Sequence, residues 1–372
     1  MTRTRTVRRT VRSLADGREI IYFDDSPDAP ERTAVDRREL GPRASAGHVR
    51  YDALVGDWVA VAGHRMNRTF LPPKDECPLC PTGRGSVPSE IPDGEYDVVV
   101  FENRFPSYAP VADDDVVAPE GYLHRPAHGR TEVVCFTSDH DSSFAALGPE
   151  RARTVVDVWA DRTAELGATP GVEHVFCFEN RGQEIGVTLH HPHGQVYAYP
   201  YVPARTAEML ARATEHHART GRLLGADLLA AERADGSRVV LAGENWTAYV
   251  PYAARWPVEV HLAPHRDVPD LVALDDAERD ELAHLYLELL RRLDGYHVRE
   301  DGPVRLPYIA AWHQAPARTG RDVSRLLLQV MSVLRGPGKL KYLAGSESAV
   351  GGWVTDTRPE AVAARLRSLA GA

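Results

Sequence analysis

The chain has 372 residues and a formal net charge of −9, with 43% hydrophobic and 26% charged residues. These proportions are ordinary for a globular protein, and the length suffices for one large domain or two smaller ones. The negative charge disfavours a nucleic-acid partner, because phosphate backbones select basic surfaces. No apolar run approaches the roughly 20 residues of a membrane helix, so we expect no membrane partner.

Residues 1–45 are predicted to form an N-terminal extension. This segment is polar and rich in proline and arginine, and it contains one expected strand at residues 19–23. No apolar stretch follows the early arginines Arg3, Arg5, Arg8, Arg9 and Arg12, so we expect no secretory signal. We interpret this end as solvated and frayed, with a short organelle-targeting segment as the alternative.

The next segment, residues 46–203, is predicted to be a first half of mixed strands and helix. Its strand candidates are short, rich in β-branched or aromatic residues, and bounded by Gly, Pro, Asn or Asp. One helix with an incomplete apolar stripe is expected among them. The expected strands are 58–61, 97–101, 132–136, 172–178 and 196–201, and the expected helix is 149–166.

The remaining segment, residues 204–372, repeats this plan. Its second helix is preceded by Asp275 with Glu278 three residues on, which resembles a capping box. The expected helices are 206–224 and 276–293, and the expected strands are 238–241, 246–250, 258–263, 308–311 and 326–331. Strands, a helix and strands thus occur twice, which predicts an α+β protein of two similar halves packed into one globule.

The four cysteines fall into two kinds. Cys135 and Cys177 lie in apolar, strand-like stretches, where cysteine behaves as a small buried side chain. Cys77 and Cys80 are two residues apart after a proline-rich turn, which suits one half of a tetrahedral zinc site, although the pair could be incidental. This usage indicates a reducing cytoplasm rather than a disulfide framework.

The densest chemical signal is a cluster of histidines at positions 190, 191 and 193, inside the run His191-Pro-His-Gly-Gln195. Gly194 permits a close approach of the backbone to a ligand, and the Gln195 amide can donate to a phosphate oxygen. A neutral imidazole at His193 is a good nucleophile towards phosphorus and leaves again readily. A histidine-rich turn and a plain metal site are the alternatives.

This run, preceded by Phe-Glu-Asn-Arg-Gly at 178–182, resembles the active-site signature of the galactose-1-phosphate uridylyltransferase family of the histidine-triad superfamily. Further segments resemble that family in its order, at residues 64–68, 101–106, 254–257, 311–316 and 341–347. The resemblance implies two histidine-triad-like halves, each an antiparallel sheet with packed helices. It also implies a homodimer, which the cysteine usage would place in the cytoplasm.

The resemblance further implies a ping-pong reaction between UDP-glucose and galactose 1-phosphate through a uridylyl-histidine at His193. The resemblance places Arg65 and Arg68 near the phosphates, where their forked, always-charged guanidinium groups would neutralise phosphate charge. Amide and hydroxyl groups would hold phosphate oxygens and the nucleoside, and the 341–347 loop would hold the sugar 1-phosphate. Besides His193 and Gln195, the implied substrate contacts are Arg65, Arg68, Asn103, Asn180, Thr188, Lys341, Tyr342 and Glu347.

The family pattern also assigns metals. It completes the zinc site of Cys77 and Cys80 with His140 and His191, which would be closed and therefore structural. This site would tie the cysteine loop to the segment that holds the nucleophile. His190 receives no role and is interpreted as a surface or packing histidine.

Some family members bind iron at a second site, through a glutamate and three histidines. Here His313 matches one of those histidines, but Leu327 and Gln329 stand in place of the other two. The glutamate position falls near Met209, beside Glu208. One histidine cannot hold iron alone, so we expect no iron.

Two other functions compete with the first. A relative with another sugar 1-phosphate or another nucleotide as substrate is favoured by the altered 325–335 region, which also lacks an aromatic-proline run usual in the family. A non-catalytic, zinc-stabilised nucleotide-binding protein is the third possibility. The presence of both His193 and Gln195 argues against it.

Overall fold

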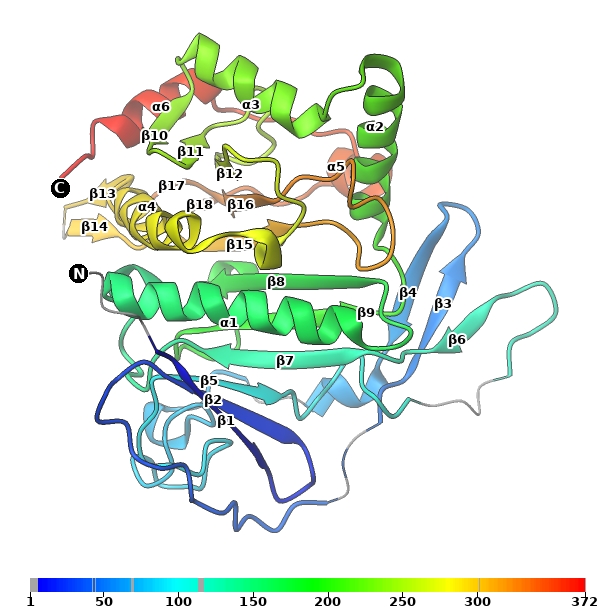
Figure 1. The fold of residues 1–372 in the computed structure, drawn as a ribbon, viewed down its shortest axis with the longest axis vertical. Coiled ribbons are helices and arrows are strands. Elements are labelled where there is room, and N and C mark those ends of the chain that lie inside the picture. Colours follow the sequence, from blue (N-terminus) through cyan, green and yellow to red (C-terminus); the bar gives the residue numbers. More distant parts are fainter. Residues whose placement is uncertain are drawn as a thin grey trace.

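The computed structural model describes residues 6–41, 43, 45–67, 70–112, 117–300 and 302–371. Within them, one 11-stranded sheet runs through the whole molecule, and neighbouring strands are antiparallel (Figure 1). In spatial order its strands are β1 (Arg8–Ser13), β2 (Glu19–Asp24), β5 (Val98–Glu102), β7 (Arg130–Cys135), β9 (His193–Tyr199), β8 (His174–Arg181), β15 (Tyr308–His313), β16 (Leu327–Ser332), β12 (Val258–Pro264), β11 (Trp246–Tyr249) and β10 (Val239–Ala242).

Two long helices cover one face of this sheet, α1 (Pro149–Ala168) and α4 (Asp276–Asp294) (Figure 1). Proline at the first position of α1 suits a helix start, because its missing N–H would have no partner there. The predicted capping box of α4 is confirmed, with Asp275 accepting from the Glu278 N–H and Glu278 accepting in return. The two helices and the sheet enclose one continuous apolar core.

The two halves meet between β8 and β15 and are related by an approximate twofold. In the first half Gln195 of β9 faces Phe178 of β8, and in the second half Gln329 of β16 faces Ala311 of β15. The crossover helix α1 precedes the first strand pair, and α4 precedes the second. The prediction of two similar halves in one globule is therefore confirmed.

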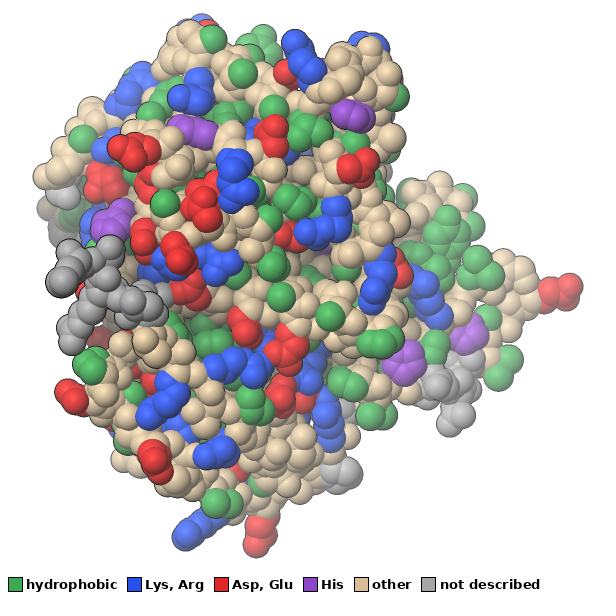
Figure 2. All heavy atoms as spheres, viewed as in Figure 1, with side chains coloured by type: hydrophobic (Ala, Val, Ile, Leu, Met, Phe, Trp, Pro, Cys, Tyr) green, Lys and Arg blue, Asp and Glu red, His purple; other side chains and the backbone are tan. Residues whose placement is uncertain are grey.

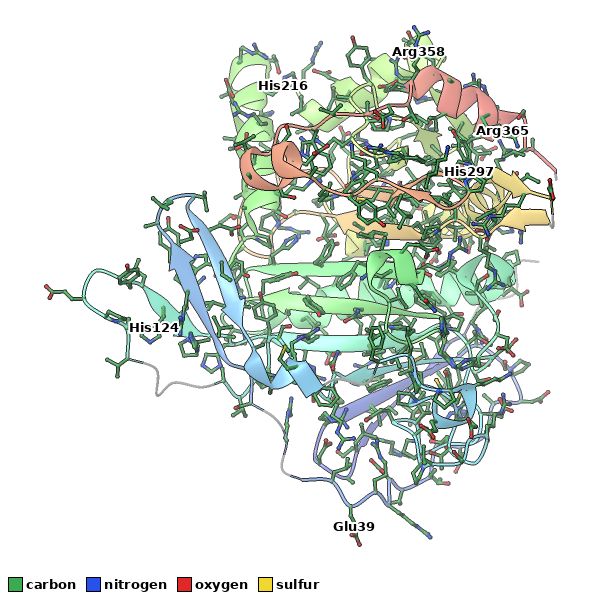
Figure 3. The ribbon with its side chains drawn as sticks, turned by 180° about the vertical axis from the view of Figure 1, so that it is seen from behind. Glu39, His124, His216, His297, Arg358 and Arg365 are labelled. Carbon is green, nitrogen blue, oxygen red and sulfur yellow. The ribbon has the colours of Figure 1, made fainter. Side chains whose placement is uncertain are left out.

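Smaller elements surround this frame. A three-stranded sheet projects from the first half, with His124 marking its outer strand in Figure 3. Helices α2 and α3 flank the second half. The remaining elements are β3 (His48–Asp52), β4 (Asp57–Val61), β6 (His124–Pro126), α2 (Ala204–Thr220), α3 (Leu224–Asp235), β13 (His297–Arg299), β14 (Gly302–Val304), β17 (Leu334–Gly336), β18 (Lys339–Leu340), α5 (Gly345–Val350), α6 (Pro359–Arg367) and five 3₁₀ turns: η1 (Gly63–Asn67), η2 (Lys74–Glu76), η3 (Phe144–Ala146), η4 (Gln183–Ile185) and η5 (Leu271–Ala273).

Three expectations about these elements are wrong. The helix expected over 206–224 is α2, but it ends at Thr220, because Gly221 takes a left-handed conformation (φ +70°), and α3 was not expected after it. Strand β9 begins at His193 rather than at residue 196. The N-terminus is not frayed from residue 8 onward, because β1 pairs with β2, and Arg8 and Arg9 form ion pairs with Asp24 and Glu165.

The surface over α1 and α4 carries interspersed acidic and basic side chains (Figure 2). Arg153 of α1, for example, pairs with Asp157, Asp276 and Asp280. On this face, basic side chains are therefore balanced by acidic neighbours. In the described part of the chain, no helix combines the length and the apolar character that crossing a bilayer requires.

Candidate active site

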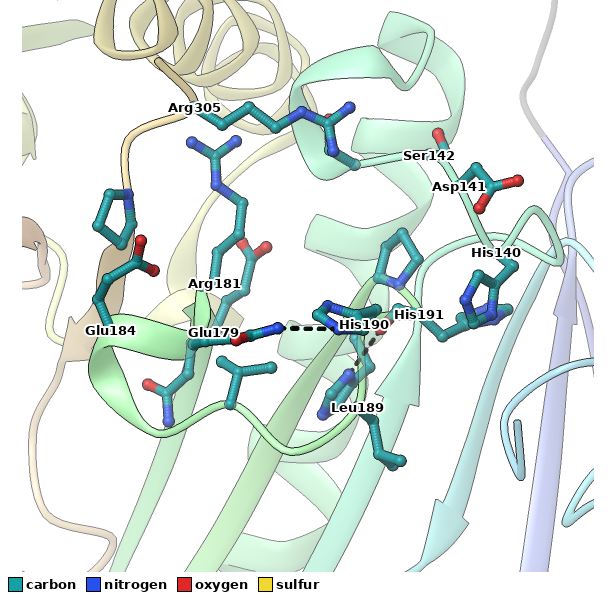
Figure 4. A pocket seen from close by; sticks show the side chains of 18 of the residues that line it. His140, Asp141, Ser142, Glu179, Arg181, Glu184, Leu189, His190, His191 and Arg305 are labelled. Carbon is teal, nitrogen blue, oxygen red and sulfur yellow. Dashed lines mark hydrogen bonds between the residues drawn. The ribbon is translucent and has the colours of Figure 1, made fainter. Parts of the chain in front are cut away.

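A cavity of about 550 Å³ opens where strand β8 ends and strand β9 begins, at the junction of the two halves (Figure 4). The first half contributes the histidine run, the end of β8 and the short turn η4. The second half contributes residues 305–307, just before β15. The volume is typical of small-molecule sites, which span roughly 300–1,000 Å³.

The side chain of His193 lines this cavity in a defined orientation. Its Nδ1 atom lies 2.8 Å from the backbone oxygen of His191. Because a carbonyl can only accept, Nδ1 must carry the hydrogen and Nε2 must carry the lone pair. Burial lowers the pKa of His193, which favours the neutral imidazole.

Two glycines of the signature are required by packing. A Cβ atom on Gly194 would lie 2.8 Å from the Phe136 ring and 2.9 Å from the oxygen of Phe178. Gly194 therefore lets β9 pack closely on its neighbours, and the expectation that it also admits a ligand stays a prediction. Gly182 has φ +105°, and a Cβ there would lie 2.6 Å from Pro307 of the second half.

Four predicted metal ligands converge beside the cavity. One ligand atom from each of Cys77, Cys80, His140 and His191 lies within 4.8 Å of those of the others. The Cys80 sulfur lies 3.3 Å from Nδ1 of His140 and 3.6 Å from Nδ1 of His191. Zinc with ordinary bond lengths and tetrahedral angles separates a sulfur and a nitrogen ligand by about 3.5 Å. The four residues therefore fit a zinc ion.

Hydrogen bonds behind the ligands support this arrangement. Nε2 of His191 lies 2.8 Å from the oxygen of Thr137, so it donates there and leaves the Nδ1 lone pair facing the cysteines. The hydroxyl of Tyr96 lies 2.8 Å from the same Nε2 atom and donates to Leu79. Burial, and next the neighbouring Cys77, raise the pKa of Cys80 to about 12, as expected for a thiol group packed among apolar residues.

The predicted phosphate and nucleoside contacts lie on neighbouring loops. The Arg65 guanidinium donates to the oxygen of Phe105 and to the Ser107 hydroxyl, at 2.9 and 2.8 Å. Asn103 accepts through its side chain from the Phe105 N–H, which fixes the same loop. Arg65 and Asn103 are thus brought together, but neither lines the cavity of His193. Arg68 lies outside the described residues.

Three further predicted contacts lie on the signature strands and the loop between them. Asn180, at the end of β8, lines the cavity together with His193. Gln195 is two residues beyond His193 on β9, so the two side chains project from the same face of the sheet. The oxygen of Thr188 accepts from the Leu71 N–H, which ties the segment after Arg68 to the histidine loop.

The predicted sugar-phosphate loop lies elsewhere on the second half. Lys341 is buried, donates to the oxygen of Arg255 and lies 3.5 Å from the Glu347 carboxylate. Tyr342 is 75% exposed. Within one chain, none of the three predicted loop residues lines the cavity of His193.

The residues at the family's second metal position do not fit iron. Nε2 of His313 lies 2.9 Å from the amide oxygen of Gln329, whose amide nitrogen donates to Glu259 at 2.6 Å. Leu327 offers no ligand atom. A histidine already bound to an amide, beside a leucine, cannot supply a cation with an iron coordination shell.

Three residues at the same cavity were not among the predicted contacts. Arg305 lines it from the second half, and Glu179 and Arg181 line it from β8. Burial raises the pKa of Glu179 to about 7, and Tyr308 donates to its carboxylate at 2.9 Å. Arg305 reaches the cavity through the pairing of β8 with β15, which no local motif indicates. Glu179 and Arg181, by contrast, lie in the 178–182 run on either side of the predicted Asn180.

Comparison with known proteins agrees with this geometry. Family models for galactose-1-phosphate uridyl transferase match residues 38–203 (N-terminal domain) and 209–370 (C-terminal domain). A galactose-1-phosphate uridylyltransferase from Streptomyces lividans is 53% identical over 310 residues, covering 83% of this chain and 81% of that protein. One from Thermotoga maritima is 32% identical over 325 residues, covering 86% and 97%.

Solved structures show the same fold. A structure described as a uridylyltransferase superposes with a TM-score of 0.77 at 29% identity, over 87% of this chain and 98% of that one. An ADP-glucose phosphorylase from Arabidopsis thaliana, at 20% identity and a TM-score of 0.64 over 86% and 98%, shares the fold. The chain belongs to the galactose-1-phosphate uridylyltransferase family.

Proposed function

We propose that this protein is a nucleotidyltransferase that exchanges a uridylyl group between UDP-glucose and galactose 1-phosphate. One observation carries the proposal: the Nδ1 hydrogen of His193 is held by the oxygen of His191, which leaves Nε2 as a nucleophile at a cavity. The family relationship supports the choice of substrates.

The reaction proceeds in two displacements at one phosphorus. Nε2 of His193 attacks the α-phosphorus of UDP-glucose, an N–P bond forms, and the P–O bond to glucose 1-phosphate breaks. A phosphate oxygen of galactose 1-phosphate then attacks the same phosphorus, and the N–P bond breaks. The Nδ1 hydrogen bond stabilises the positive charge that the ring carries in the intermediate.

Positioning and charge neutralisation supply most of the catalysis in such transfers. We propose that Asn180, Gln195 and Thr188 hold phosphate oxygens, and that Arg65 and Arg68 neutralise phosphate charge. Asn103 contacts the nucleoside. Arg305, which lines the cavity and forms no ion pair with a described residue, adds a second-half guanidinium to the site.

We propose zinc as the ion held by the four-residue cluster. The donor set of two thiolates and two imidazoles favours this ion over Mg²⁺ or Ca²⁺, which prefer oxygen ligands. The bound ion would hold His191 in place, and the His191 oxygen orients His193. Its role is therefore structural, and no step of the transfer passes through it.

The position of the 341–347 loop favours a homodimer. Tyr342 is exposed, and the loop lies away from the cavity of its own chain. We propose that Lys341, Tyr342 and Glu347 contact the sugar 1-phosphate in the cavity of a second copy. We further propose an extension at 1–45 with halves at 46–203 and 204–372, and a reducing compartment such as the cytoplasm, in keeping with four unpaired cysteines.

The alternative substrates rested on the altered 325–335 region. Within one chain, residues 323–327 and 329 line a separate cavity and not that of His193. Their change therefore gives no reason to alter the substrate of the first cavity. UDP-glucose and galactose 1-phosphate remain the proposed pair.

Exchange with isolated half-reactions tests the proposal. The protein is incubated with UDP-glucose, freed of small molecules, and given single sugar 1-phosphates. We expect released glucose 1-phosphate in the first step, and UDP-galactose after addition of galactose 1-phosphate. Folded protein that releases no glucose 1-phosphate contradicts uridylyl transfer, and discharge only by another sugar 1-phosphate contradicts the proposed acceptor.

A further inference from the structure

A second cavity, of about 450 Å³, lies on the second half between helices α2 and α3 and the face of the sheet opposite α4. One wall is apolar. It includes Tyr249, Ala263 and Leu327 from the strands and Met209 and Leu228 from the helices. Met209 and Leu228 are 37% and 55% exposed, so apolar surface is left open to solvent here.

This cavity is the twofold counterpart of the surface around the nucleophile. Gln329 occupies in β16 the place that Gln195 occupies in β9. Two residues before each glutamine stand Leu327 and His193, respectively. The second half therefore repeats the strand geometry of a nucleotide site but has leucine in place of the nucleophile.

Two arginines at this cavity have no ion-pair partner among the described residues. Neither Arg205 nor Arg255 forms an ion pair or a side-chain hydrogen bond with a described residue, and Arg255 lies 5.5 Å from the centre of the Trp353 ring. By contrast, Arg212 and Arg325, which line the same cavity, pair with Glu208 and Asp267. Partial desolvation and then the charge of Arg255 lower the pKa of Arg205, as expected for guanidinium groups of like charge.

The buried carboxylate nearby is already satisfied. Glu259 accepts the N–H groups of Arg255 and Trp256 on one oxygen, and Gln329 and His261 donate to the other. The Gln329 oxygen therefore faces His313, which donates through Nε2. Each of these groups is turned towards its partner, so the carboxylate does not pair with either free arginine.

The start of α2 adds N–H donors on the same side. Arg205 and Thr206 belong to its first turn and line the cavity, and the preceding Pro203 gives no side-chain cap. Free N–H groups at a helix start favour an anion, and an anion between two arginines gains charge-assisted bonds. His216 of α2, marked in Figure 3, bonds Asp227 of α3 at 2.7 Å and fixes the two helices that form this wall.

We propose that this cavity binds a nucleoside 5′-phosphate without transferring it. The phosphate lies between Arg205, Arg255 and the start of α2, and the base packs on the apolar wall that includes Tyr249. Inorganic phosphate or a sugar phosphate would leave the apolar wall exposed to water. A nucleotide fits better, because its flat base can cover that wall. Leu327 stands where a nucleophile would be needed, so the site binds and does not react.

Equilibrium dialysis with labelled UMP tests the proposal on the full-length protein. In the double variant Arg205→Gln, Arg255→Gln, the affinity of the second site for UMP should be at least tenfold weaker than in the unaltered protein. At UMP concentrations that fill this site in the unaltered protein, the variant should therefore bind one equivalent less per chain. Arg219→Gln, farther along α2 and outside the cavity, should bind as the unaltered protein does. Equal binding by the double variant would overturn the site.

Two further readings separate the outcomes. The double variant should still release glucose 1-phosphate from UDP-glucose, so failure of the second site and failure of the proposed transferase function are distinguishable. Inorganic phosphate should displace the second equivalent of UMP only at concentrations at least tenfold higher than unlabelled UMP. Displacement at equal concentration would overturn the nucleoside assignment in favour of an anion alone.

Discussion

Removal of one cysteine ligand should have a far larger effect than an ordinary core substitution. Cys80 lies within 3.6 Å of both histidine ligand atoms, and the site joins three segments that are distant in sequence. Structural zinc contributes on the order of 10 kcal/mol in zinc-finger peptides, comparable with the whole stability of a typical domain. Packing around Leu79, Ile91 and Tyr96 retains part of this segment without metal.

We therefore expect Cys80→Ala to lose roughly 5 kcal/mol or more of unfolding free energy, together with the bound zinc. Cys177→Ala is the matched control, since it removes a buried thiol from β8 outside the cluster and should cost about 1 kcal/mol. Urea unfolding and metal analysis after dialysis measure both effects. Equal losses in the two variants, or zinc retained by Cys80→Ala, would refute the assignment of the site.

Three smaller predictions concern the frame. Burial raises the pKa of Glu179 to about 7, so the free energy of unfolding should fall as pH rises from about 4.5 to 7. Urea unfolding at pH 5 and at pH 8 should show a loss of up to about 3 kcal/mol that Glu179→Gln removes. The same pH dependence in Glu179→Gln would contradict this. Arg162→Met should cost about 3–5 kcal/mol in the same assay by removing both guanidinium bonds from the buried Glu132, which then keeps, among the described residues, only its ion pair with Arg130. Adding Glu132→Gln should recover part of this cost, and a cost under about 1 kcal/mol would be contrary evidence. Asp275→Ala should lower the free energy of unfolding by about 0.5–2 kcal/mol, because α4 loses its N-cap. Thermal unfolding measures this change, and an unchanged stability would contradict the prediction.

Much of the fold could be predicted because local pattern and tertiary burial agree. Strand β5 begins with an apolar run that is buried in the structure, and Asp275 and Glu278 mark the start of α4 directly. Strand β1 could not be found this way. It is an exposed edge strand of Arg, Thr and Val, and its arginines are neutralised by distant residues such as Asp24.

The residues of the site likewise fall into those that a local motif indicates and those that only the tertiary structure brings together. His193, Asn180 and the Cys77–Cys80 pair belong to local motifs, and short-range reasoning identifies them. Arg305 reaches the cavity only because β8 and β15 join the two halves, a pairing without a signature in either segment. The required smallness of Gly194 likewise depends on Phe136 of another strand, which no spacing within the motif reveals.

Covalent labelling at His193 tests the central claim most directly. The protein is treated with UDP-glucose, quenched under conditions that preserve phosphoramidates, digested, and mapped by mass spectrometry. We predict one uridylyl group on His193, which is absent in His193→Ala and retained in His190→Ala. The His190 side chain is exposed and contacts Gln183. A uridylyl group on any other residue, or labelling that persists in His193→Ala, would contradict it.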